Sequence, residues 1–402
     1  MQKSHHIYTL TMTIRPFLAL AALLAATALP AQITTAQYIT PDTKETRSLV
    51  YNPGDEGSNQ YRIPALVVTK DGALLAVADK RIDNINDLPG KIDVVARRST
   101  DGGLTWGPHI LIAEHDSIGG YGDPAVVVDK KTGEIIVIST HGNGLWQTTP
   151  GHISVSRSKD NGLTWEKAVD INPQILTTDS LGKQPIKCNS AFATSGRALQ
   201  LKNGRIIFAL ITRQAGVECF PVYAIYSDDR GHTWHVSKNP ATLDGDESKI
   251  VELADGTLLM SIRNRWGGGR YNGKRIFATS TDKGTTWSEP QPGESLHAAA
   301  CNGSIIRYTH GGKDLLLHSL PAPGKFREDI TIYRSDDNGG TWTPTHLVSR
   351  APGAYSSMAE LPDGSIGILT EEAIGNCGER QSGGYRIWFT RISPEEFLTP
   401  IK

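Results

Sequence analysis

The chain has 402 residues, of which 41 are Lys or Arg and 42 are Asp or Glu, and its formal net charge is −1. This balance gives no overall field that would attract nucleic acid or an anionic membrane, so recognition of an anion has to be local. Glycine (41 residues) and proline (22 residues) are frequent, which favours many turns over long helices. We therefore expect a soluble, all-β protein.

The N-terminal residues have the pattern of an export signal. A basic start leads into the apolar run 17–28, which is too short to span a membrane comfortably and is followed by small residues suited to cleavage. We predict a signal peptide over residues 1–31, with cleavage after Ala28 or Ala31. The mature protein is then expected to be exported, either periplasmic or secreted, with no membrane span.

Five copies of the pattern Ser-x-Asp-x-Gly-x-Thr-Trp, here called Asp boxes, occupy residues 99–106, 158–165, 227–234, 280–287 and 335–342. In such a turn the Asp side chain accepts backbone N–H bonds, the Gly adopts a conformation that other residues avoid, and the Trp packs between strands. Residues 336–340 resemble a calcium loop, but no copy has the twelve-residue pattern with its terminal Glu. The boxes are therefore expected to be structural.

A second repeat is a turn followed by an apolar strand, and it occurs six times. Asp-Gly and Asn-Gly turns of this kind mark the corners of two-residue β-hairpins, since they supply positive φ. The glycines of the six turns are Gly72, Gly133, Gly204, Gly256, Gly312 and Gly364. Repeats of about 50 to 70 residues without helical periodicity predict a six-bladed β-propeller of four-stranded antiparallel blades, formed by residues 32–402. We expect the early strand near 48–51 to complete the last blade beside the strand 385–391, which closes the ring.

The Asp boxes together with Tyr61-Arg62-Ile63-Pro64 resemble the bacterial exo-α-sialidases, or neuraminidases, of the glycoside hydrolase family 33 type. The resemblance extends from about Arg47 to Arg391. It implies a retaining enzyme that hydrolyses terminal sialic acid from glycans or glycoproteins such as mucins, through a covalent intermediate on a tyrosine. Nucleic acid is not an expected partner.

Sialic acid carries a carboxylate on its anomeric carbon, and arginine forks hold such an anion best. The family uses three arginines for this purpose, and the resemblance assigns them to Arg62, Arg263 and Arg327. Arg265 and Arg270 compete with Arg263 for the second position.

The same carboxylate would repel an ionised Asp or Glu nucleophile, whereas a neutral phenol avoids this repulsion. Sialidases are known to use a Tyr nucleophile. The resemblance assigns this role to Tyr355, with Glu247 as the group that takes its proton. Asp246 and Glu252 are the alternatives to Glu247.

The acid that protonates the leaving oxygen is expected in the acidic loop after the first strand pair. Asp87 fits best, because it follows Arg81 at the family's interval and lies on a loop bounded by Gly and Pro. Asp83 and Asp93 are the alternatives. Arg81 resembles a further arginine that contacts the substrate.

Three supporting residues follow from the same resemblance. Asp123 matches an Asp-Pro that contacts the N-acyl side of the sugar, and Glu371 matches the acid that holds Arg62, with Glu372 as its alternative. Trp146 is expected as an aromatic wall or as a packed core residue.

We expect no cofactor and no metal, because no Gly-rich phosphate loop follows a strand and no HExxH pattern occurs. The four cysteines (Cys188, Cys219, Cys301 and Cys377) show no CxxC spacing, and both disulfide pairing and free thiols remain open. Three alternative functions also remain: an intramolecular trans-sialidase, a sialyl transferase, and a non-catalytic Asp-box propeller that binds a glycan or a protein.

Overall fold

The computed structural model describes residues 37–39, 46–145, 151–176, 188, 190–213, 218–265, 272–324, 326–375 and 384–398. The chain divides into two compact units, Met1–Ala31 and Gln32–Lys402, and all described residues belong to the second. The predicted signal peptide therefore lies outside the described residues. Within the described part, no helix has the length and apolar character needed to cross a membrane.

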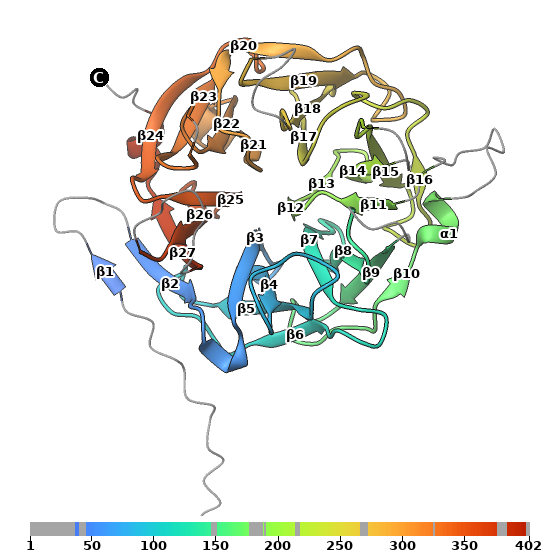
Figure 1. Cartoon of the computed structure of the whole chain (residues 1–402). Helices are drawn as coiled ribbons and strands as arrows, with labels where there is room; N and C mark the ends of the chain where they lie inside the picture. Colours follow the sequence, from blue (N-terminus) through green and yellow to red (C-terminus); the bar gives the residue numbers. More distant parts are fainter. Residues whose placement is uncertain are drawn as a thin grey trace, which may run out of the picture. The chain divides into compact units, whose positions relative to one another are not determined.

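Six antiparallel sheets form the blades of a ring, and the predicted six-bladed β-propeller is confirmed (Figure 1). Blades 1 and 2 consist of β3 (Gln60–Val68), β4 (Leu74–Arg81), β5 (Ile92–Ser99) and β6 (Ile110–Ala113), then β7 (Tyr121–Val128), β8 (Ile135–His141), β9 (His152–Ser158) and β10 (Val169–Asp170). Blades 3 and 4 consist of β11 (Ser190–Ala193), β13 (Leu199–Gln200), β14 (Ile206–Arg213), β15 (Val222–Ser227) and β16 (His235–Val236), then β17 (Ser248–Glu252), β18 (Leu258–Ile262), β19 (Lys274–Ser280) and β20 (Gln291–His297). Blades 5 and 6 consist of β21 (Ser304–Tyr308), β22 (Leu315–Leu320), β23 (Ile330–Ser335) and β24 (Thr343–Ser349), then β25 (Gly353–Glu360), β26 (Ile366–Ala373), β27 (Tyr385–Ile392), β2 (Thr46–Tyr51) and β1 (Gln37–Ile39).

The helical elements are short. They are α1 (Asn172–Ile175), α2 (Pro394–Leu398) and the 3-10 turns Asp55–Gly57 and His310–Gly312.

Each predicted Gly turn connects the innermost strand of a blade to the second strand. All six glycines have positive φ, between 74° and 94°. The turns are longer than the predicted two-residue hairpins, because β3 ends at Val68 and β4 begins at Leu74. In this first turn the N–H of Gly72 donates to the Thr69 carbonyl at 2.9 Å.

The N-terminal strand closes the ring, as the sequence predicts. β2 pairs antiparallel with β27, with Ser48 opposite Phe389, so the last blade combines both ends of the chain. The first Asp box packs on this junction. The Ser48 hydroxyl accepts a hydrogen bond from Trp106 Nε1 at 2.9 Å and donates to the Gly103 carbonyl at 2.6 Å.

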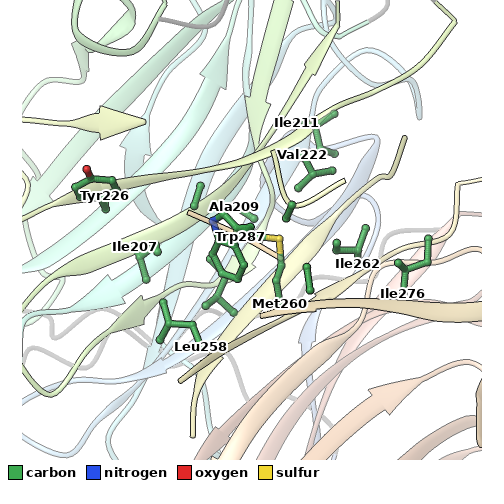
Figure 2. Packing of buried hydrophobic residues seen from close by; sticks show 14 of the residues in the cluster. Ile207, Ala209, Ile211, Val222, Tyr226, Leu258, Met260, Ile262, Ile276 and Trp287 are labelled. Atoms are coloured by element: carbon green, nitrogen blue, oxygen red, sulfur yellow. The ribbon is translucent and has the colours of Figure 1, made fainter. Parts of the chain in front are cut away.

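The core lies between neighbouring blades. Figure 2 shows the cluster between blades 3 and 4, where Ile207 and Tyr226 pack with Met260, Ile262 and Trp287. These side chains alternate along their strands with residues that face the adjacent blade interface, as expected for strands covered on both faces.

Blade 3 departs from the regular pattern. Between β11 and β13 the chain leaves its own sheet, and β12 (Gly196–Arg197) pairs in parallel with β7 of blade 2. β12 lies against β3, β7 and β25, the innermost strands of blades 1, 2 and 6 (Figure 1). This segment therefore lies in the central channel of the ring, which the repeat pattern does not predict.

Candidate active site

A cavity of about 270 Å³ lies where the innermost strands begin. Antiparallel pairing puts the start of each innermost strand beside the end of the second strand, so both positions face one mouth of the channel. Seven of the predicted site residues line this cavity: Arg62, Asp87, Asp123, Glu247, Arg263, Arg327 and Tyr355.

Glu371 is a fully buried residue of β26 that joins the first and last blades. Its Oε1 accepts hydrogen bonds from Arg62 Nε (2.8 Å) and from the Ile63 N–H (2.6 Å), and its Oε2 accepts from the Tyr355 N–H (3.1 Å). Glu372 instead pairs with Arg47 at 2.5 Å. Glu371 therefore contacts Arg62, as the resemblance suggests, and it does so from behind the cavity wall.

A backbone bulge in β3 presents Arg62 to the cavity. Pairing with β4 shifts register between Arg62 and Ala65, and Ile63 has φ of 61°. Side chains normally avoid this conformation, and the Glu371 hydrogen bond to the Ile63 N–H helps to hold it.

Tyr355 and Glu247 form the central contact of the site. The Tyr355 hydroxyl donates to Glu247 Oε2 at 2.7 Å, and Arg263 Nη1 donates to both the same carboxylate oxygen and, at 3.2 Å, the Tyr355 hydroxyl. Burial raises the pKa of Tyr355 well above its usual value, and the Glu247 charge raises it further. The phenol is therefore neutral at pH 7 and is hydrogen-bonded to a proton acceptor.

The three arginines surround this phenol. The guanidinium carbons of Arg62 and Arg327 lie 5.3 and 5.6 Å from the centroid of the Tyr355 ring. Arg327 Nε and Nη2 both donate to the Ala300 carbonyl, at 3.1 and 2.8 Å, which fixes the guanidinium plane. Three positive groups thus converge on one cavity that also contains a neutral nucleophile.

Asp87 projects into the cavity from the loop between β4 and β5, and its side chain is 77% exposed. Arg81 Nη2 donates to Asp87 Oδ1 at 2.6 Å. Arg81 itself is buried behind Asp87 and is not among the residues that line the cavity, and its contact with substrate stays a prediction. The alternatives lie elsewhere, since Asp83 pairs with Lys91 and Asp93 with His115.

The charge on Asp87 is set by opposing effects. Loss of solvent around its carboxylate at the cavity mouth raises the pKa of Asp87, but Arg81 first, then Arg62 and Arg327, more than offset this and hold the pKa below its usual value. In the free protein Asp87 is therefore ionised at neutral pH.

Asp123 lies on a second bulge, in β7, where its φ is 57° and the pairing with β8 shifts register. Its N–H donates to Asp79 Oδ1 at 3.0 Å. Burial and the neighbouring Asp79 carboxylate raise the pKa of Asp123 well above its usual value, and burial raises the pKa of Asp79 to about 7. Asp79 was not singled out from the sequence, because it looks like an ordinary position of β4.

One side of the cavity is apolar, with Leu145, Phe192 and Phe220 in its wall. Arg265, the described competitor of Arg263, stacks on the Phe220 ring at 3.3 Å from its centroid. Arg263 is the arginine that contacts Glu247 and Tyr355. Trp146 and Arg270 lie outside the described residues.

Asp246 also lines the cavity and faces Arg263, at 3.3 Å from Oδ2 to Nε. Glu252, the other alternative to Glu247, lies at the far end of β17, where it accepts a hydrogen bond from the Lys202 N–H. Among the described contacts, Glu247 is the acid of these three that accepts a hydrogen bond from the Tyr355 hydroxyl.

A buried polar network lies next to Glu247, on the side away from the cavity. The sequence analysis did not predict it. Lys249 Nζ donates to Asn302 Oδ1 at 2.8 Å, and Asn302 Nδ2 donates to the Ser195 hydroxyl at 3.1 Å. Ser195 in turn faces Glu247 Oε1 at 3.5 Å. Arg275 Nη1 donates to the Cys301 carbonyl at 2.8 Å in the same region. Strand periodicity alone gives no signal for a buried cation.

In the described part of the chain, no group of three or more His, Cys, Asp or Glu side chains is arranged to hold a metal ion. Cys188, Cys219 and Cys301 are free thiols, and Cys377 lies outside the described residues.

Comparison with known proteins places these features in a family. Residues 87–368 match the family described as BNR repeat-like domain. A sialidase of Paraclostridium sordellii is 31% identical over 82% of this chain and 86% of its own length. The chain belongs to the sialidase family. A sialidase of Micromonospora viridifaciens is 34% identical over 89% of this chain.

Among solved structures, the Hadza microbial sialidase Hz136 is 30% identical with a TM-score of 0.75, covering 87% of this chain and 69% of that one. This sialidase-family chain spans 57% of the Micromonospora relative's length.

Proposed function

We propose that the protein is an exo-α-sialidase that hydrolyses terminal sialic acid from glycans or glycoproteins such as mucins and retains the anomeric configuration. The observation that carries the proposal is the 2.7 Å hydrogen bond from the Tyr355 hydroxyl to Glu247 in a cavity lined by three arginines. Membership of the sialidase family supports it. We also propose that the protein is exported, on the basis of its N-terminal sequence.

Binding begins with the carboxylate of the substrate, which lies among Arg62, Arg263 and Arg327. Each guanidinium presents a fork of donors that matches a carboxylate, and the partly enclosed cavity strengthens the charge-assisted hydrogen bonds. The anomeric carbon carries this carboxylate and is thereby held close to the Tyr355 hydroxyl.

In the first step the Tyr355 oxygen bonds to the anomeric carbon while the bond from that carbon to the leaving oxygen breaks. The phenol proton passes to Glu247 Oε2, along the existing hydrogen bond. Asp87 gives its proton to the leaving oxygen, and the alcohol departs.

In the second step a water molecule gives a proton to Asp87 while its oxygen bonds to the anomeric carbon. The bond to Tyr355 breaks, and Glu247 returns the proton to the phenol oxygen. Each step inverts the carbon, so the product retains the original configuration.

Asp87 has to carry a proton before the first step, although it is ionised in the free protein. Arg62 and Arg327 contribute to its lowered pKa. A bound substrate carboxylate neutralises part of their charge, so the pKa of Asp87 rises when the substrate binds.

The decisive variant is Tyr355→Phe, which removes the attacking oxygen and keeps the ring. We expect turnover of an α-sialoside to fall by about 100-fold or more, with an unchanged melting temperature. Tyr61→Phe is the matched control, since its hydroxyl bonds to the Asp55 carbonyl outside the cavity. Near-native turnover by Tyr355→Phe would rule out the covalent tyrosine mechanism.

The reaction class is tested by NMR of the first product released from an α-sialoside. Free sialic acid that appears first as the α-anomer is the expected result. A 2,7-anhydro sugar would instead identify an intramolecular trans-sialidase, and an initial β-anomer would exclude retention. Transfer to an added sugar acceptor in place of water would identify a transferase.

A further inference from the structure

A second cavity, of about 310 Å³, lies at the other mouth of the central channel. The catalytic cavity is lined by residues from the starts of innermost strands, such as Arg62 and Tyr355, whereas this one is lined by residues from their ends, such as Val68 and Glu360. The two cavities therefore open toward opposite ends of the channel.

The β12 crossing provides the polar centre of this second cavity. Gly196 and Arg197 pair with Ala125 and Val126 of β7, and Arg197 lines the cavity. Gly196 has φ of 98°, and a Cβ atom there would lie 3.0 Å from Lys249 Cε. The tight fit of Gly196 fixes the backbone that presents Arg197.

The Arg197 guanidinium has no partner among the described residues: none accepts a hydrogen bond from it or forms an ion pair with it. Burial lowers the pKa of Arg197, and the Glu360 charge only partly offsets this effect. Arg197 is only partly buried, so its guanidinium is accessible to an anion that enters the cavity, and the reduced solvent there strengthens a charge-assisted hydrogen bond.

Two other charged groups of the cavity, Asp129 and Lys130, are already engaged. The Asp129 carboxylate accepts hydrogen bonds from the N–H groups of Lys131 and Thr132, both at 2.8 Å. Lys130 Nζ donates to the Gln200 carbonyl at 3.1 Å. These contacts leave Arg197 as the group in this cavity that is best placed to receive a ligand.

The remaining wall is apolar, and it includes Val68, Val128 and Leu199. We propose that this cavity binds a small organic monoanion, whose carboxylate pairs with Arg197 and whose apolar body packs on these three side chains. A dianion fits less well, because Asp129 and Glu360 lie in the same cavity. The proposal does not depend on the proposed glycosidase activity.

The test uses benzoate and its neutral counterpart benzamide as probes, with the catalytic cavity filled by a planar, carboxylate-bearing sialic acid analogue. Binding is followed by ligand-observed NMR titration. We expect benzoate to bind more tightly than benzamide. Arg197→Gln should weaken benzoate binding by about 10-fold or more and leave benzamide binding unchanged, because the charge-assisted fork is lost.

Lys202→Gln is the control for the general field, since Lys202 is an exposed cation of the neighbouring rim whose Nζ donates to the Ala254 carbonyl. Its benzoate affinity should change less than about 3-fold. Equal binding of the two probes, or an unchanged benzoate affinity in Arg197→Gln, overturns the proposal. So does benzoate binding that disappears when the catalytic cavity is filled.

A measurement on the native protein covers the case in which Arg197→Gln does not fold. Methyl NMR should show contacts from the benzoate ring to the methyl groups of Val68, Val128 and Leu199. Contacts confined to other methyl groups count against this cavity.

Discussion

Lys249 is a buried lysine in the interior of the ring, next to the catalytic cavity. It is buried on β17, its ammonium contacts a neutral amide, and burial lowers its pKa to about 7. The Glu247 charge works in the opposite direction and favours the protonated form. A cation in this position makes the stability of the fold depend on pH.

We predict the direction of this dependence from the lowered pKa. Between about pH 7 and 10.5 the unfolded chain binds a proton at Lys249 that the folded chain lacks, so the free energy of unfolding rises with pH in this range. Below about pH 7 Lys249 is protonated in both states, so it no longer makes the free energy of unfolding change with pH. Relative to Lys249→Met, the native protein should therefore gain stability from pH 7 to 9.5, by at most about 1.4 kcal/mol per pH unit.

Chemical denaturation of both proteins at the two pH values measures this difference. The same substitution at the exposed residue Lys238 should give a difference that is flat with pH. If the difference in unfolding free energy between the native protein and Lys249→Met is also independent of pH, then burial does not lower the pKa of Lys249.

Predicted site residues that carry a motif, such as Arg62 and Tyr355, line the cavity, because Tyr-Arg-Ile-Pro and the sequence around Tyr355 specify both residue type and position. Asp79, Lys249 and Arg275 were missed, because each occupies an ordinary strand position and only the ring brings it below the site. Arg81 was predicted as a substrate contact, yet it is buried behind Asp87. Sequence spacing gives the position of Arg81 along the chain but not its depth below the cavity.

At the scale of elements, the Asp boxes stabilise the outer hairpins. Asp101 accepts hydrogen bonds from the N–H groups of Leu104 and Thr105, both at 3.0 Å, and from the Ser99 hydroxyl at 2.8 Å. No described box residue lines the catalytic cavity. The structural role expected from the sequence therefore agrees with their position.

Asp101→Ala should lower stability by about 1–2 kcal/mol while leaving kcat/KM unchanged at temperatures where the protein is folded. Asp337→Ala in the fifth box is the matched comparison. We expect the first box to be the more sensitive, because Gly103 and Trp106 also hold Ser48 of the closing strand. Thermal melts check this order, and a selective loss of activity in Asp101→Ala would contradict the structural role.

The regular elements were predictable because each repeat carries its own local signals: a Gly turn with positive φ and an Asp box. The β12 crossing was not predictable from the sequence. Its two residues join the sheet of blade 2, and their contacts are with β3, β7 and β25, which are distant in sequence. The turn lengths were also wrong, since local sequence specifies a turn more clearly than it specifies its length.

At the scale of the whole molecule, stability depends on closure. β2 supplies the fourth strand of blade 6, where Arg47 also stacks on Trp388 and pairs with Glu372. Without β2, the edge of β27 is exposed and the ring has a gap beside the first blade.

Two truncations test this dependence. A chain of residues 32–402 should keep the melting temperature and activity of the mature protein, whereas a chain of residues 52–402 lacks β2 and should be aggregated or strongly destabilised. Size-exclusion chromatography and thermal melts distinguish the outcomes. A monomeric, active 52–402 chain would show that the ring does not need its N-terminal strand.

The pairing of β2 with β27 also sets an order of events during synthesis. Among the described strands of the ring, β2 is one of the first to leave the ribosome, and its partner β27, from Tyr385 onward, is the last. The earlier blades have time to form while β2 waits without its neighbour, and a ribosome that stalls before residue 385 releases a chain with an unpaired strand at one end. Completion of the last blade therefore requires synthesis to have passed the strand that begins at Tyr385.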